Sequence, residues 1–175
     1  MSMIGMTPVL TLYSILIAAV IQDFRQMKIS NRLILFGLSA AVVFRILENG
    51  IQKIIWVLPD IAFPVIVLYL FYLLGVIGAG DIKLFSVVGG FTNFTEVTSC
   101  MVYAFVAGAA VSLAKMLYRR ELLFRLFLAK NYFKGLAMGE LEPYSYKTRE
   151  GTIHFSLEIL VGYICVCVIS IWKVS

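Results

Sequence analysis

The chain has 175 residues, of which 61% are apolar and 14% charged, with a net charge of +5 and a mean hydropathy of +0.94. These values exclude an ordinary soluble domain, in which about 45–50% of residues are apolar. A transmembrane helix needs about 20 apolar residues. We therefore expect an all-α, polytopic integral membrane protein with about six transmembrane helices, forming one domain over residues 1–175.

Six apolar segments are predicted to cross the membrane. They cover residues 3–21, 29–47, 54–77, 82–94, 97–118 and 153–172. The fourth is short and contains Gly89 and Gly90. We expect it to cross by local thinning of the bilayer or by shielding among the other helices.

Basic residues near the ends of membrane spans mark the cytoplasmic side. The connection after the first span carries Arg25, Lys28 and Arg32, and residues 119–150 carry seven Lys or Arg. Both stretches are therefore predicted to be cytoplasmic, with the two termini outside. Residues 121–134 mix large apolar and basic residues, as an interfacial helix bound to membrane lipid does; the alternative is that this segment guides substrate to the site.

Two aspartates, Asp23 and Asp81, each lie where an apolar segment meets a polar one, and the predicted topology places both on the cytoplasmic face. Two carboxylates brought together share a proton and act as acid and base. Asp81 closes the sequence Gly78-Ala79-Gly80-Asp81. We expect the two glycines to permit strained dihedrals and close approach of a substrate; the alternative is a glycine hinge in which Asp81 only caps a helix.

Two polar residues near these aspartates are candidates for supporting roles. Lys83 is predicted either to act on Asp81 or a substrate carbonyl, or to extend its charge toward the membrane surface. Asn31 is predicted to donate a hydrogen bond near Asp23.

The remaining acids of the apolar segments are expected to be peripheral. Asp60 is predicted to lie across the membrane from the other two aspartates, at a helix break near two prolines or at the outer interface. Glu158 is expected to meet water or a basic partner, with a place in the active cavity as the alternative. The three cysteines form no Cys-x-x-Cys pair and are predicted to be packing residues; no metal, cofactor or nucleic-acid partner is expected.

Residues 23–31, Asp-Phe-Arg-Gln-Met-Lys-Ile-Ser-Asn, resemble the first signature of type IV prepilin peptidases, an aspartate followed at fixed spacing by Ile-Pro-Asn. Residues 78–84, Gly-Ala-Gly-Asp-Ile-Lys-Leu, resemble the second, Gly-x-Gly-Asp-x-Lys-Leu. Residues 151–155 followed by Gly162 are similar to a segment near the last span of that family. Ser30 and His154 stand where the family pattern has proline, and neither change removes a catalytic group.

The resemblance implies an aspartic endopeptidase of the inner membrane with Asp23 and Asp81 as its catalytic pair. Its partners would be prepilin or pseudopilin precursors, from which it would remove a short basic leader at the cytoplasmic face. The chain lacks the cysteine-rich insertion of larger members, so it looks like the short form of tight-adherence or archaeal preflagellin systems, without methyl transfer. The alternatives are an intramembrane protease similar to presenilin or signal peptide peptidase, and a non-enzymatic transporter or scaffold.

Overall fold

The computed structural model describes residues 3–50, 54–55, 57–74, 76–118 and 155–174. Within them the chain forms six α-helices and no strand: α1 (Met3–Gln26), α2 (Asn31–Asn49), α3 (Val57–Leu73), α4 (Ala79–Phe91), α5 (Phe94–Tyr118) and α7 (Phe155–Val174). The all-α class is therefore confirmed. His154 and the predicted interfacial segment 119–150 lie outside the described residues.

The chain divides into two compact units, Met1–Ala107 with His154–Ser175 and Gly108–Ile153. The first unit holds α1 to α4, α7 and the part of α5 that ends at Ala107. All the candidate site residues described below belong to this unit.

Several of the helices suit a lipid environment. Among the described helices, Thr7–Gln26 of α1, Phe94–Tyr118 and Phe155–Trp172 are long and apolar enough to cross a membrane, and Val57–Leu73 is a shorter apolar helix. Many large apolar side chains of the helices are also exposed, among them Leu35, Ile66 and Leu70. These observations agree with a polytopic membrane protein.

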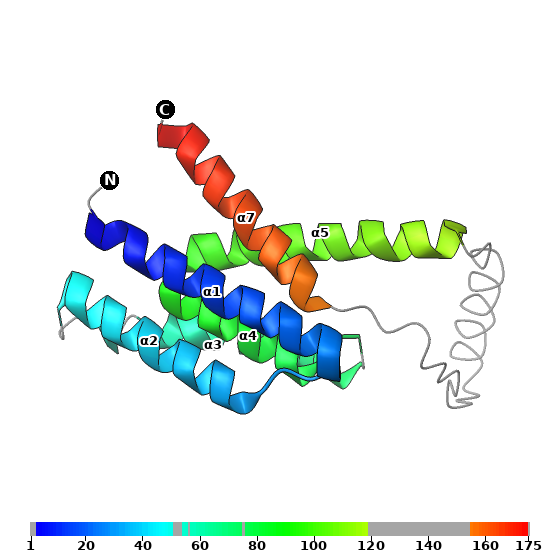
Figure 1. The fold of residues 1–175 in the computed structure, drawn as a ribbon, viewed down its shortest axis with the longest axis horizontal. Coiled ribbons are helices and arrows are strands. Elements are labelled where there is room, and N and C mark those ends of the chain that lie inside the picture. Colours follow the sequence, from blue (N-terminus) through cyan, green and yellow to red (C-terminus); the bar gives the residue numbers. More distant parts are fainter. Residues whose placement is uncertain (1–2, 51–53, 56, 75, 119–154, 175) are drawn as a thin grey trace. The chain divides into compact units, whose positions relative to one another are not determined.

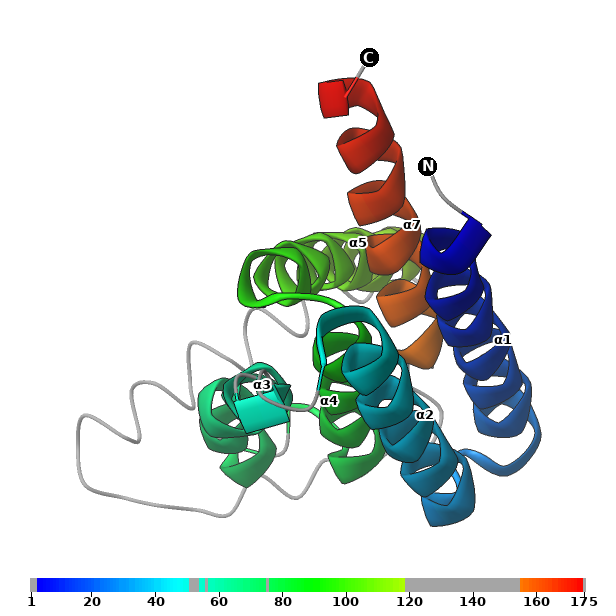
Figure 2. The same ribbon diagram turned by 90° about the vertical axis from the view of Figure 1, so that its left-hand side faces the viewer.

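The short helix α4 lies among its neighbours and packs against α1, α2, α3 and α7 (Figures 1 and 2). Every residue from Leu84 to Gly90 is buried. A Cβ atom on Gly89 would lie 2.2 Å from the carbonyl oxygen of Asp60, and one on Gly90 would lie 2.9 Å from Cβ of Ala41. The glycines therefore let α3 and α2 approach α4 closely, which confirms that this short segment is shielded among other helices.

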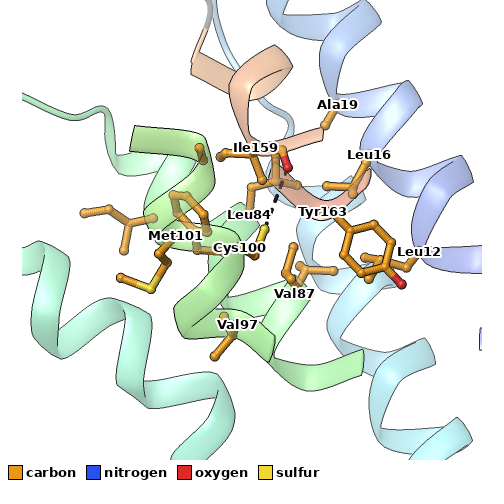
Figure 3. Close-up of a cluster of buried hydrophobic side chains, with 14 of the residues drawn as sticks. Leu12, Leu16, Ala19, Leu84, Val87, Val97, Cys100, Met101, Ile159 and Tyr163 are labelled. Atoms are coloured by element: carbon orange, nitrogen blue, oxygen red, sulfur yellow. Dashed lines mark hydrogen bonds between the residues drawn. The ribbon is translucent and has the colours of Figure 1, made fainter. Parts of the chain in front are cut away.

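A cluster of buried apolar side chains joins α1, α4, α5 and α7 (Figure 3). It includes Leu12, Leu16, Leu84, Val87, Val97, Cys100, Ile159 and Tyr163. The thiol of Cys100 contacts the carbonyl oxygen of Ile159 at 3.8 Å, so this cysteine is a packing residue as predicted. A Cβ atom on Gly162 would lie 2.6 Å from the carbonyl oxygen of Cys100, and this close contact fixes α7 against α5.

An ion pair holds the C-terminal end of α4. Nη2 of Arg45, on α2, lies 3.3 Å from Oδ2 of Asp60, in the first turn of α3. The guanidinium also donates to the carbonyl oxygens of Gly90, at 3.2 Å from Nε, and of Thr92. Asp60 is thus remote from Asp81 as predicted, but the predicted helix break is wrong, because α3 continues through Pro64.

Candidate active site

Asp23 lies in the last turn of α1, which continues to Gln26 instead of ending near residue 21. The helix ends because Met27 adopts a left-handed conformation, with φ 51°. The amide of Met27 donates to the carbonyl oxygen of Asp23 at 2.8 Å, the hydrogen bond of an αL helix cap. Asp23 is therefore held in a regular helical turn, with its side chain partly buried.

Ser30 connects the end of α1 to the start of α2. Its φ of −66° and ψ of 131° are angles that proline also adopts. Its hydroxyl accepts a hydrogen bond from the amide of Arg32 at 3.2 Å and caps α2. Its own amide donates to Oε1 of Gln22 at 2.9 Å, which proline could not do. The change from proline thus keeps the turn and adds a bond beside Asp23.

Asp81 lies in the first turn of α4 and its side chain folds back over Gly78. The amide of Asp81 donates to the carbonyl oxygen of Gly78 at 3.1 Å. A Cβ atom on Gly78 would lie 3.0 Å from Oδ2 of Asp81, whereas one on Gly80 would make an ordinary contact of 3.6 Å with Ile29. Gly78 therefore makes room for the carboxylate of Asp81.

The expectation that the glycines adopt strained dihedrals is wrong. Gly78 has φ −75° and ψ 147°, which any residue adopts. Among the glycines of the described residues, only Gly50 has a positive φ. The absence of a side chain, and not backbone freedom, explains why glycine suits position 78.

Lys83 and Asn31 form a hydrogen bond with each other. Nζ of Lys83 donates to Oδ1 of Asn31 at 2.9 Å, and both residues are exposed. Asn31 accepts this hydrogen bond through its amide oxygen, and the prediction that it donates near Asp23 stays a prediction. The bond ties the start of α2 to the first turns of α4 on the side of the candidate site.

Helix α7 brings two polar residues to the aspartates. The hydroxyl of Ser156 donates to Oδ2 of Asp23 at 2.7 Å. Ser156 is 0% and Glu158 3% exposed, which contradicts the interpretation that Glu158 meets water and favours its alternative place in the active cavity. The ring of Phe155 packs 6.2 Å from that of Phe85 and anchors this turn against α4.

The sequence analysis missed Ser156. The signal that could have found it is its place directly after Phe155, in the third segment that resembles the prepilin peptidases. Nothing in the sequence alone shows that this serine faces an aspartate 133 residues away.

The acids influence one another. The pKa of Asp81 is raised to about 6, mainly by burial and also by the negative charges of Asp23 and Glu158, against the lowering effect of the hydrogen bond with Gly78. A helix N-terminus favours a negative charge by only about 0.3–1 kcal/mol. The rise from 3.8 to about 6 corresponds to about 3 kcal/mol at 1.36 kcal/mol per pKa unit, so burial and like charge prevail.

The charge of Asp23 acts on Asp81, which supports the prediction that the two aspartates lie close together. Asp23 comes from the end of α1, Asp81 from the start of α4, and Glu158 from the first turn of α7. Among the described residues, no group of three or more His, Cys, Asp or Glu side chains is placed to hold a metal ion.

Comparison with protein families gives a match to the type IV leader peptidase family over residues 10–113. The matched range exceeds half of the chain and contains both Asp23 and Asp81. The chain belongs to this family. A search of curated proteins and a search of solved structures each found no match.

Membership identifies the chain as a protease of the leader-peptidase kind, whose substrates in general resemble type IV prepilins. The family match ends before α7. The assignment of Ser156 and Glu158 to the candidate site of this leader peptidase therefore depends on the structure and not on the family match.

Proposed function

We propose that the protein is an aspartic endopeptidase that removes the short basic leader from prepilin-like precursors at the cytoplasmic face of the inner membrane. Asp23 and Asp81 are its catalytic pair. The observation that carries this proposal is the placement of two aspartates, 58 residues apart in sequence, at the end of α1 and the start of α4, where the charge of Asp23 acts on Asp81. The match to the leader peptidase family supports the same reaction.

The chemistry follows from a shared proton. When one carboxylate is ionised and the other protonated, the ionised member takes a proton from a bound water, and the water oxygen attacks the peptide carbonyl. The protonated member donates a hydrogen bond to the oxyanion that forms. The peptide C–N bond then breaks, the carbonyl carbon keeps the water oxygen, and the leaving nitrogen takes a proton from the pair.

The charges near Asp23 support the proposed membrane face. Arg25, Lys28 and Arg32 are exposed close to Asp23 in the sequence, as expected for a cytoplasmic connection.

The test is co-expression with a panel of leader-bearing pilin precursors, with cleavage read as a mobility shift. Asp23→Asn and Asp81→Asn should each abolish processing, while Glu48→Gln, which neutralises an exposed carboxylate on α2, should not. Helix content measured by circular dichroism in detergent must be retained in every variant. Cleavage by either aspartate variant would overturn the assignment of the pair, and a wild type that cleaves no precursor would overturn the substrate class.

A further inference from the structure

The last turn of α1 is held at several points around Asp23. The amide of Met27 donates to the carbonyl oxygen of Asp23 at 2.8 Å. The side chain of Gln22 accepts a hydrogen bond from the amide of Ser30 at 2.9 Å. These bonds hold the backbone of the turn, whereas the carboxyl group can still rotate about its side-chain bonds. A hydrogen bond from another helix reaches the carboxyl group itself, because the hydroxyl of Ser156 donates to Oδ2 of Asp23 at 2.7 Å.

We propose that Ser156 is a positioning residue of the active site, which holds the carboxyl group of Asp23 in the orientation that cleavage needs. This inference rests on the proposed function, in which Asp23 belongs to the catalytic pair. Ser156 acts through Asp23 and not on the substrate. It lies outside residues 10–113, which match the leader peptidase family, so the match assigns it no role.

The hydrogen bond from Ser156 restricts the carboxyl group in the way that catalysis requires. A separation of 2.7 Å is the most common one for an O–H···O bond. Once Oδ2 is held against α7, the plane of the carboxyl group is fixed. A catalytic acid or base must lie within about 2.6–3.2 Å of the group with which it exchanges a proton, and a displacement of about 1 Å can lower the rate about a hundredfold.

This positioning does not depend on which aspartate holds the shared proton. The hydroxyl of Ser156 can donate to Oδ2 when Asp23 is ionised, and it can also do so when the other oxygen of Asp23 carries the proton. The same bond can therefore hold the carboxyl group throughout a reaction in which the proton moves.

Ser156 is itself held in place by its surroundings. Its side chain is fully buried, so water does not compete for the hydroxyl. The ring of the neighbouring Phe155 lies 6.2 Å from that of Phe85 on α4 and 5.4 Å from that of Phe105 on α5. Further along α7, the close contact of Gly162 with the backbone of α5 fixes the helix. A supporting group locked by packing in this way is what makes the geometry of a catalytic site precise.

The serines of other helices show the ordinary alternative for a helical serine. Four of them donate to a carbonyl oxygen three or four residues earlier in their own helix: Ser14, Ser39, Ser86 and Ser99. Such local bonding is common. Ser156 lies in the first turn of α7, and its hydroxyl instead crosses to a carboxyl group on α1.

The experiment is the steady-state kinetics of precursor cleavage by purified enzyme in detergent, with kcat and KM measured separately. Ser156→Ala should lower kcat about tenfold or more, as expected for a lost hydrogen bond to a charged group. KM should stay within about twofold of the wild-type value, because the hydroxyl does not contact substrate. A change in kcat alone is the result expected of a residue that positions a catalytic group.

Matched variants separate the hydrogen bond from packing. Ser156→Thr keeps the hydroxyl and should keep kcat within a few-fold of wild type. Ser156→Cys fills the same space with a weak donor and should resemble Ser156→Ala, which keeps the test decisive if the extra methyl group of threonine prevents folding. Ile159→Val trims another fully buried side chain of α7; it should lower the thermal stability but leave kcat within a few-fold of wild type.

Wild-type kcat in Ser156→Ala or Ser156→Cys would overturn the inference, as would a loss confined to KM or a folded Ser156→Thr enzyme as slow as Ser156→Ala. These outcomes are distinct from failure of the proposed function. If Asp23→Asn and Asp81→Asn are inactive while Ser156→Ala is fully active, only the role of Ser156 is refuted. If the aspartate variants cleave, the catalytic pair itself is refuted.

Discussion

Replacing Asp81 by Asn should abolish cleavage and at the same time stabilise the fold. The pKa of Asp81 is raised from 3.8 to about 6, mainly by burial. The difference is about two pKa units, and each unit is 1.36 kcal/mol. At neutral pH the ionised side chain therefore costs the folded state up to about 3 kcal/mol, and asparagine avoids this cost because it is neutral.

The pH dependence of this gain follows from the sign of the shift. A carboxyl group whose folded pKa lies above its unfolded pKa binds more protons in the folded state between the two values. Folding is therefore favoured below the unfolded value of 3.8, and this advantage is lost as pH rises through about 6. Asp81→Asn should match the wild type near pH 4, gain stability between pH 4 and 6, and keep a constant advantage above that range.

The measurement is the free energy of unfolding by denaturant in detergent, followed by circular dichroism at several pH values from 4 to 8. Glu48→Gln is the matched control, because it also neutralises a carboxylate but at an exposed position on α2. It should change the free energy of unfolding by less than about 0.5 kcal/mol, as is usual for a surface substitution. An Asp81→Asn protein that is no more stable than wild type at pH 7.5, or that has the same advantage at every pH, would refute the reasoning.

Three glycine substitutions test the close contacts of α4. Gly78→Ala should lower the rate of cleavage by about tenfold or more, because the new Cβ would lie 3.0 Å from Oδ2 of Asp81 and displace it; Gly80→Ala, with only an ordinary contact, should stay within a few-fold of wild type in the same assay. Gly89→Ala should lower the free energy of unfolding by roughly 1–3 kcal/mol, because its Cβ would lie 2.2 Å from the carbonyl oxygen of Asp60. Unchanged stability in that variant would contradict the close packing of α3 on α4.

Much of the fold and the central pair of the site could be predicted from the sequence. Each of the six described helices coincides largely with one of the predicted apolar segments. The largest difference at the end of a helix is in α1, which extends to Gln26 instead of ending near residue 21. The helices could be predicted because they depend on hydropathy, which is a property of single segments. The distribution of Lys and Arg along the chain predicts that Asp23 and Asp81 share one face of the membrane, and this stays a prediction.

The predictions that failed concern which helices are neighbours. Ser156 and Glu158 reach the aspartates because α7 packs on α1 and α4, a contact that their own segment does not reveal. The sequence analysis assigned no role to Arg45, although it binds Asp60 from a different helix. Such pairs depend on the order of helices in space, which hydropathy leaves open.

The length of α4 links the ion pair to the properties of the site. Thirteen residues make a helix of about 20 Å, shorter than the roughly 30 Å hydrocarbon core. Its last carbonyl groups therefore need partners that lipid cannot supply, and Arg45 donates to those of Gly90 and Thr92 while Asp60 balances its charge.

At the other end of α4, Ala79 and Lys83 are exposed, whereas Asp81 is partly buried. Burial and the charges of Asp23 and Glu158 raise the pKa of Asp81 there. The same short helix therefore satisfies its last carbonyl groups with a charged pair at one end and carries a carboxyl group with a raised pKa at the other.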